Sequence, residues 1–170
     1  MGFGRIGREV SALGQAFGMR VVAWSRSPIT QPPEGIEVVP TLAELAVCSD
    51  VVSVHTAPSP DGPLLDAAFF NAMNMGSIFI NVARGGVVDE EALLNAIEVR
   101  ALRVGTDVFE GEPSGGEAAF DSPLAQHPSV VATHHVGAAT VQAQEAVAEV
   151  LVQIIDVYST SAQVMNAVAV

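Results

Sequence analysis

Hydrophobic positions along the chain follow two alternating periods. Windows with an apolar residue every three to four positions predict helices, whereas short apolar runs between Gly, Pro or polar clusters predict buried strands. Helices are expected over residues 5–17, 66–73, 89–99 and 140–158, and a further short helix follows Thr41, with Glu44 completing a capping box. Strands are expected over residues 19–24, 36–39, 51–54, 77–82, 102–108 and 130–133.

The order of these segments predicts the architecture. Short apolar strands that alternate with helices indicate βαβ units and a parallel sheet. We therefore expect an α/β fold with a doubly wound parallel sheet of the Rossmann type, formed by a single domain over residues 1–170. Residues 110–123 are expected to form a long loop.

Composition narrows the function classes. The net charge of −12 disfavours nucleic acid and anionic membranes as partners. No apolar run approaches the ~18–20 residues that span a bilayer, and the single Cys48 suits a reducing compartment, so a cytoplasmic protein is expected. All seven basic residues are arginines, which excludes Schiff-base and standard P-loop chemistry for this chain alone.

A glycine-rich turn opens the chain. Gly2, Gly4 and Gly7 fit the pattern G-x-G-x-x-G at the start of the first predicted helix, where backbone N–H groups hold the phosphates of a dinucleotide. The pattern normally follows a strand, whereas only Met1 precedes it here. We therefore expect the sheet to lack its first strand, and interpret the chain as a fragment or the product of a miscalled start.

The residues at the end of the strand that follows the first helix, ~20 residues after the glycine pattern, concern the choice of cofactor. Ser25 and Arg26 stand where an acidic residue would favour the 2′-hydroxyl of NAD. Arg26 can pair with the 2′-phosphate of NADP, stack on adenine or remain a solvated turn residue. NAD and NADP both stay open.

Three later segments carry polar or charged residues at the ends of predicted strands. They are NVARGG at 81–86, DVFEGEP at 107–113 and THHVG at 133–137. In an open parallel sheet, ligands bind at the carboxyl ends of the strands. Dehydrogenation of a hydroxy acid needs the arginine, carboxylates and histidine that these segments supply.

These segments also carry a family resemblance. GFGRIGREV, NVARGGVVDEEALL, DVFEGEP and HHVGAAT resemble, in order, the signatures of the D-2-hydroxyacid dehydrogenases, a family that includes phosphoglycerate dehydrogenase and hydroxypyruvate/glyoxylate reductases. The resemblance covers essentially the whole chain. It implies hydride transfer between NAD or NADP and a small D-2-hydroxy acid or 2-oxo acid, and a homodimer for the full-length protein.

The resemblance implies a role for each catalytic candidate. Arg84 binds the substrate carboxylate, and its planar fork suits bidentate pairing. His135 is the general acid/base at the C2 oxygen, and Glu112 bonds its far nitrogen and favours its protonated form. His134 stands where many members have proline, which leaves it as the alternative to His135, although Val136 and Gly137 favour His135.

Further residues are implied as cofactor contacts. Asp107 bonds the nicotinamide carboxamide, and Arg5 and Ile6 meet the pyrophosphate. The nicotinamide side is lined by Val82, Ala83 and His135 to Ala138, with Gly137 among them. His55 and Thr56 also belong to the cofactor set, although the proline usual in that segment is displaced by one residue.

Two alternatives to an enzyme remain. The first is a non-catalytic dinucleotide-binding or sensor protein, which the transcriptional corepressors of the same family resemble. The second is an inactive fragment.

Overall fold

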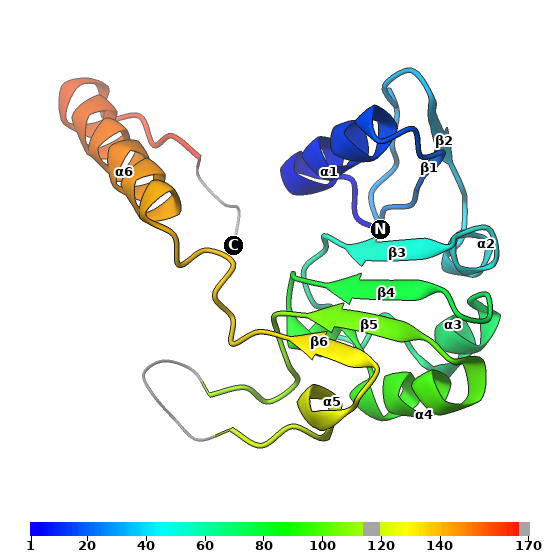
Figure 1. Ribbon diagram of the computed structural model, residues 1–170. Coiled ribbons are helices and arrows are strands. Elements are labelled where there is room, and N and C mark those ends of the chain that lie inside the picture. The colour runs from blue at the N-terminus through cyan, green and yellow to red at the C-terminus, as the bar shows by residue number, and fades with distance from the viewer. Residues whose placement is uncertain (114–119, 167–170) are drawn as a thin grey trace. The chain divides into compact units, whose positions relative to one another are not determined.

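The computed structural model describes residues 1–113 and 120–166, and Figure 1 shows the course of the chain. The chain divides into two compact units, Met1–His134 (unit 1) and His135–Val170 (unit 2), each of which is described by itself. Unit 1 contains α1 (Arg5–Ala16), β1 (Val21–Ala23), β2 (Ile36–Val38), α2 (Leu42–Val47), β3 (Val51–Val54), α3 (Ala67–Ala72), β4 (Ile78–Asn81), the 3₁₀ helix η1 (Gly85–Val87), α4 (Glu90–Arg100), β5 (Arg103–Thr106), α5 (Pro123–Gln126) and β6 (Val130–Ala132). Unit 2 contains α6 (Val141–Ser161).

The strands of unit 1 form two parallel sheets. β1 pairs with β2, and a second sheet has the order β3-β4-β5-β6. Its register aligns Val52 with Phe79, Phe79 with Val104 and Val104 with Val130. The predicted α/β fold with a parallel Rossmann-type sheet is confirmed.

Side-chain caps explain where the helices begin. Thr41, Asp66, Asp89 and Thr140 each accept a hydrogen bond from the backbone N–H three residues later, which satisfies one of the free donors of a helix start. α4 also carries acidic residues in its first turn and Arg100 in its last, as the helix dipole favours. The apolar pattern predicted these helices, and these caps show why they begin where they do.

Most of the core lies on one face of the four-stranded sheet. Figure 1 shows α3 and α4 running beside this sheet, and their apolar side chains join those of α2 and the strands in one buried cluster. Phe70 is fully buried at its centre and packs edge-on against Phe69 and Phe79, with ring centroids 5.4 and 5.2 Å away. A smaller cluster of Phe3, Ala23 and Ile36 lies beside β1 and β2.

The chain start lies between the two sheets. The Met1 amino group donates to the carbonyl of Ser53 (2.8 Å), and the N–H of His55 donates to the Met1 carbonyl (2.8 Å). On the other side, the N–H of Gly2 donates to the carbonyl of Trp24 (2.7 Å). β1 and β3 are joined through Met1 and Gly2, at the position where the missing first strand was expected.

Several expectations need refinement. The expected strand over 19–24 is shortened to Val21–Ala23, because only these residues pair with β2. The expected loop over 110–123 overlaps α5 at Pro123, and its residues 114–119 lie outside the described part. A single domain over 1–170 stays a prediction. Among the helices of residues 1–113 and 120–166, none has the length and apolarity to cross a membrane.

The apolar faces of two helices are exposed within their own units. In α1, Ile6 is 67% and Leu13 60% exposed, and Phe17, which caps the end of the helix, is 84% exposed. In α6 no described residue is buried, and Leu151 and Ile155 are among its exposed apolar side chains. Periodicity predicted both helices correctly, but it does not say what packs against them.

Candidate active site

The glycine turn at the start of α1 is built for close backbone packing. Gly2 has a φ of +80°, and a Cβ on Gly7 would lie 2.1 Å from the Gly2 carbonyl oxygen, so Gly7 must be glycine for the turn to close. Gly4, the N-cap of α1, has open space around its Cβ position and gives the helix no side-chain cap. The first N–H groups of α1, at Arg5 and Ile6, are therefore available to an anion.

This turn fits the phosphates of a dinucleotide. The first turn of α1 carries no acidic side chain, and Arg5 and Ile6 are exposed. Open space at Gly4 allows close approach of a phosphate to the backbone. The predicted cofactor residues Gly2, Gly4, Arg5, Ile6 and Gly7 thus lie together in one turn.

Arg26 contacts the segment that follows β3. Its guanidinium donates to the carbonyl of Ala57 (2.9 Å) and to the hydroxyl of Thr56 (3.3 Å). The structure thereby brings Arg26 and Thr56 together, two residues that the sequence placed in the cofactor set separately. Arg26 is exposed, so its remaining donors face solvent beside the end of β1.

His55 is a neutral imidazole at physiological pH. It is half-buried, and its Nε2 lies 3.0 Å from the Ser53 hydroxyl. Burial, and secondarily the nearby positive N-terminus, lowers the pKa of His55 to about 4. His55 can therefore offer a hydrogen bond to a ligand without adding charge.

Asn81 organises the loop that carries Arg84. Asn81 is buried at the end of β4, where its amide accepts from the N–H of Ala83 (3.1 Å) and donates to the carbonyl of Arg84 (3.0 Å). Arg84 is exposed, and its guanidinium donates to the Ala83 carbonyl (2.6 Å). Sequence reasoning gave Asn81 no role, although a buried asparagine between a strand and a loop is a signal for one.

The loops after β4 and β5 are in direct backbone contact. A Cβ on Gly85 would lie 1.9 Å from the Phe109 carbonyl oxygen and 2.5 Å from the N–H nitrogen of Glu110. A carboxylate oxygen of Glu112 accepts from the N–H of Phe109 (3.1 Å). The segments of Arg84 and Glu112 are therefore held against each other through Gly85.

Asp107 lies at the end of β5, below these loops. It is buried, its N–H donates to the Asn81 carbonyl (3.1 Å), and the Thr133 hydroxyl donates to its carboxylate. Thr133 links the end of β6 to β5, a positioning role that sequence reasoning missed. Arg84, Asp107 and Glu112 thus share the carboxyl edge of one sheet, as expected.

The histidine candidates fall on either side of the division between units. His134 is exposed and ends unit 1, whereas His135 begins unit 2 together with Gly137 and Ala138. His135 has a φ of +54°, a left-handed backbone conformation that is uncommon outside glycine and concentrates at functional sites. Arg84 and Glu112 are placed together in unit 1, and His135 is described in unit 2.

Comparison with known proteins finds similarity to one family of dehydrogenases. Residues 1–137 match the family model described as D-isomer specific 2-hydroxyacid dehydrogenase, NAD binding domain. The chain is 39% identical over 162 residues to D-3-phosphoglycerate dehydrogenase of Rattus norvegicus, covering 92% of this chain and 29% of the rat protein.

Solved structures give the same picture. An NADPH-dependent glyoxylate/hydroxypyruvate reductase from Sinorhizobium meliloti, in complex with NADP and malonate, superposes with a TM-score of 0.84 at 29% identity. The match covers 99% of this chain and 51% of the reductase. The chain thus spans less than a third of the rat relative and about half of the bacterial one.

Proposed function

Because this chain belongs to the D-isomer specific 2-hydroxyacid dehydrogenase family through its NAD-binding domain, we propose that it is the cofactor-binding part of an enzyme that transfers a hydride between NAD(P) and a small D-2-hydroxy or 2-oxo acid. The packing of the Arg84 loop against the Glu112 segment through Gly85 carries this proposal. An arginine and a carboxylate on two adjoining loops at this edge of the sheet suit an enzyme that binds an acidic substrate.

Each residue has a proposed task. Arg84 holds the substrate carboxylate: the guanidinium has five N–H donors and uses one nitrogen for Ala83, so its other donors can form a bidentate pair. His135 exchanges a proton with the C2 oxygen, and Glu112 orients its ring. Bound NAD(P) supplies or accepts the hydride.

The remaining cofactor residues position the dinucleotide. The N–H groups of Arg5 and Ile6 bind the pyrophosphate at the start of α1. Val82, Ala83, Gly137 and Ala138 line the nicotinamide side, and Asp107 bonds its carboxamide. His55 and Thr56 contact the cofactor from the segment after β3.

Binding and turnover test the proposal in two steps. Nicotinamide fluorescence measures NADH and NADPH binding to this chain. Absorbance then measures turnover of glyoxylate and hydroxypyruvate by two proteins. The first is the chain alone, and the second is a chimera in which the chain is substituted for the NAD-binding domain of the Sinorhizobium reductase. Arg84→Ala removes a charge-assisted contact worth on the order of 2–4 kcal/mol, so kcat/KM should fall about 30-fold or more while cofactor affinity is kept.

Other outcomes are informative. Tight cofactor binding without turnover in either form would identify a dinucleotide sensor in place of an enzyme. Loss of cofactor affinity in Arg84→Ala with an unchanged kcat would make Arg84 a cofactor ligand.

Cofactor preference is proposed to depend on Arg26. Arg26 is exposed at the end of β1, beside the expected position of the ribose. Arg26→Asp should weaken NADPH binding about 10-fold or more and leave NADH binding equal or tighter, because a carboxylate repels the 2′-phosphate. Fluorescence titrations with both cofactors measure this, and equal losses for the two would assign Arg26 to the loop contact with Ala57 alone.

The complete protein is further proposed to form a homodimer. The exposed apolar face of α1, with Ile6, Leu13 and Phe17, supports association with a second copy, because contiguous exposed apolar surface marks interaction sites.

A further inference from the structure

A second carboxylate contacts the loop that carries Glu112. Glu90, the first residue of α4, accepts a hydrogen bond through its Oε1 from the backbone N–H of Glu110 (2.6 Å). We propose that Glu90 is a positioning residue for the reaction, which fixes the loop after β5 so that the Glu112 carboxylate keeps its place. This inference rests on the proposed function, in which Glu112 orients the ring of His135.

Two adjacent N–H groups of this loop donate to carboxylates. The N–H of Phe109 donates to a Glu112 oxygen (3.1 Å), and the N–H of Glu110, one residue further, donates to Glu90 (2.6 Å). A movement of the backbone at Glu110 therefore also moves the Phe109 donor. The contact from Glu90 thus acts on Glu112 through a single residue, Phe109.

The start of α4 gives Glu90 a rigid base. The side chain of Asp89 caps the helix by accepting from the N–H of Ala92 (2.9 Å), and the N–H of Asp89 donates to the Leu65 carbonyl (3.0 Å). On the inner face of α4, Leu93 is buried in the large core cluster. A carboxylate on this first turn is therefore held precisely enough to position another group.

Packing holds the first part of the loop, and Glu90 holds the part that follows. Val108 and Phe109 are buried, whereas the next two residues are exposed. The second of these, Gly111, has a φ of +68°, so the chain turns there before it reaches Glu112. The bond from Glu90 thus fixes the backbone at the point where burial ends.

The environment of Glu90 argues against a role in helix charge alone. Glu90 is half-buried, whereas Glu91, the next residue of the same helix turn, is exposed. Burial raises the pKa of Glu90, the hydrogen bond from the Glu110 N–H lowers it, and the charge of Glu110 raises it. An acidic residue favours the helix dipole while it is solvated, as Glu91 does. The dipole therefore does not explain why Glu90 is desolvated, whereas the bond to the loop does.

Three variants separate the possible effects of this carboxylate. Glu90→Ala removes the acceptor, and a hydrogen bond to a charged acceptor is stronger than one between neutral groups. Glu90→Gln removes the charge but keeps an oxygen acceptor at the same reach. Glu91→Ala is the matched control, because it removes one negative charge from the same helix turn at an exposed position.

Amide hydrogen exchange of the whole chain measures positioning without any reaction. In Glu90→Ala, exchange at Glu110 and Phe109 should become about tenfold faster or more, because both donors lose a fixed backbone. Glu90→Gln should stay within about threefold of the unsubstituted chain, and Glu91→Ala should change neither amide. In Glu112→Ala the Phe109 amide should exchange faster while the Glu110 amide stays protected, because Glu90 is anchored on α4.

Turnover of glyoxylate by the chimera with the Sinorhizobium reductase measures the consequence for the reaction. In Glu90→Ala, kcat should fall about tenfold, because the general acid/base loses its orientation. KM for glyoxylate and the affinity for NADPH should change by less than about twofold, since Arg84 and the glycine turn keep their contacts. Glu90→Gln should restore most of kcat, and Glu91→Ala should leave it unchanged.

The outcomes separate this proposal from the proposed function. Equal effects of Glu90→Ala and Glu91→Ala would show an effect of helix charge and overturn the proposal. An unchanged Phe109 amide in Glu90→Ala, or an unchanged kcat despite faster exchange, would overturn it as well. A chimera without turnover would count against the proposed function, and exchange of the Phe109 amide would then still decide whether Glu90 holds the Glu112 loop.

Discussion

The two sheets of unit 1 contain the same kind of strand but differ in what supports them. The four-stranded sheet has three continuous ladders, and its cluster contains 20 buried residues. The β1–β2 pair has one ladder and a cluster of three, Phe3, Ala23 and Ile36. Since stability comes mostly from buried apolar area, we expect the four-stranded sheet to contribute most of the stability and the β1–β2 pair to open more easily.

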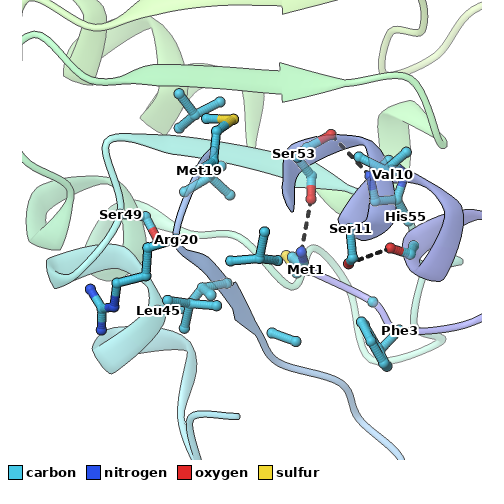
Figure 2. A pocket seen from close by; sticks show the side chains of 18 of the residues that line it. Met1, Phe3, Val10, Ser11, Met19, Arg20, Leu45, Ser49, Ser53 and His55 are labelled. Carbon is cyan, nitrogen blue, oxygen red and sulfur yellow. Dashed lines mark hydrogen bonds between the residues drawn. The ribbon is translucent and has the colours of Figure 1, made fainter. Parts of the chain in front are cut away.

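This difference parallels the proposed division of function. The Arg84 and Glu112 segments, which we propose to act on the substrate, lie at the end of the well-packed sheet, where dense packing holds them in place. The glycine turn and Arg26 lie beside the poorly packed β1–β2 pair, and Gly2 and Gly7 of the turn also line the space between β1 and β3 (Figure 2). Dinucleotide affinity should therefore depend on the order of β1 and β2, and binding of a dinucleotide should stabilise this pair.

Replacing one buried phenylalanine in the cluster beside each sheet, Phe70 of α3 and Phe3 of the turn before α1, tests the comparison most strongly. Phe70→Ala removes a ring at 0% exposure between two other rings and should lower the free energy of unfolding by about 3–5 kcal/mol. Phe3→Ala, at 8% exposure in the three-residue cluster, should cost about 1–2 kcal/mol, because open space beside it lets the site relax. Urea unfolding measures both.

The control for this pair is Phe17→Ala. Phe17 is 84% exposed, so its removal should change stability within about 0.5 kcal/mol. Equal losses for Phe70 and Phe3 would show that both sheets unfold as one equally packed body, against the comparison.

The pH dependence of stability should come from two groups near the chain start, the Met1 amino group and His55. The Met1 amino group has a pKa of about 6 in the folded chain, lowered from 8.0 by burial. Between these values the unfolded chain binds more protons, so the free energy of unfolding should rise with pH from 6 to 8, by about 2–3 kcal/mol at most. This gain in the free energy of unfolding is lost again as the pH falls from 8 to 6.

Acetylation of the amino terminus separates this effect from others. Urea unfolding at pH 6, 7 and 8 should show a slope for the free chain and a flatter response for the acetylated chain. His55 acts at lower pH: its pKa of about 4, against 6.5 unfolded, makes stability rise between those values. His55→Gln should remove that lower part of the dependence, and an unchanged profile would place the titrating group elsewhere.

The elements were predictable because their signals are local. Thr41, Asp66, Asp89 and Thr140 begin helices as caps, and the strand over 51–54 was predicted with its bounds. α5 was not, since four residues are too few to show a helical period. The absence of a strand between β1 and β3 was predicted from the position of the glycine pattern. In a Rossmann-type fold this pattern directly follows a strand.

The site was only partly predictable. Motif order gave Arg84, Asp107 and Glu112, and the structure places all three at one sheet edge. The roles of Asn81 and Thr133 depend on hydrogen bonds to loops and neighbouring strands, which no sequence period encodes. The exposed face of α1 illustrates the same limit, because an amphipathic pattern shows that a face is apolar and not what it packs against.

A last substitution concerns the contact that holds the Arg84 loop, at the end of the well-packed sheet. In Gly85→Ala the new methyl would lie 1.9 Å from the Phe109 carbonyl oxygen, so one backbone segment must move, at a cost of about 1–3 kcal/mol. Gly86→Ala is the matched control, because its methyl would meet only the Pro58 side chain, at 3.9 Å. Urea unfolding should therefore separate two adjacent substitutions of the same size, with Gly86→Ala near zero. The shift in Gly85→Ala should also move the loop that carries Ala83 and Arg84, while the glycine turn at α1 keeps its geometry. NADH affinity should therefore fall by less than about tenfold in Gly85→Ala and stay unchanged in Gly86→Ala. A larger loss in Gly85→Ala would show that the glycine turn beside the β1–β2 pair is coupled to the Arg84 loop of the four-stranded sheet.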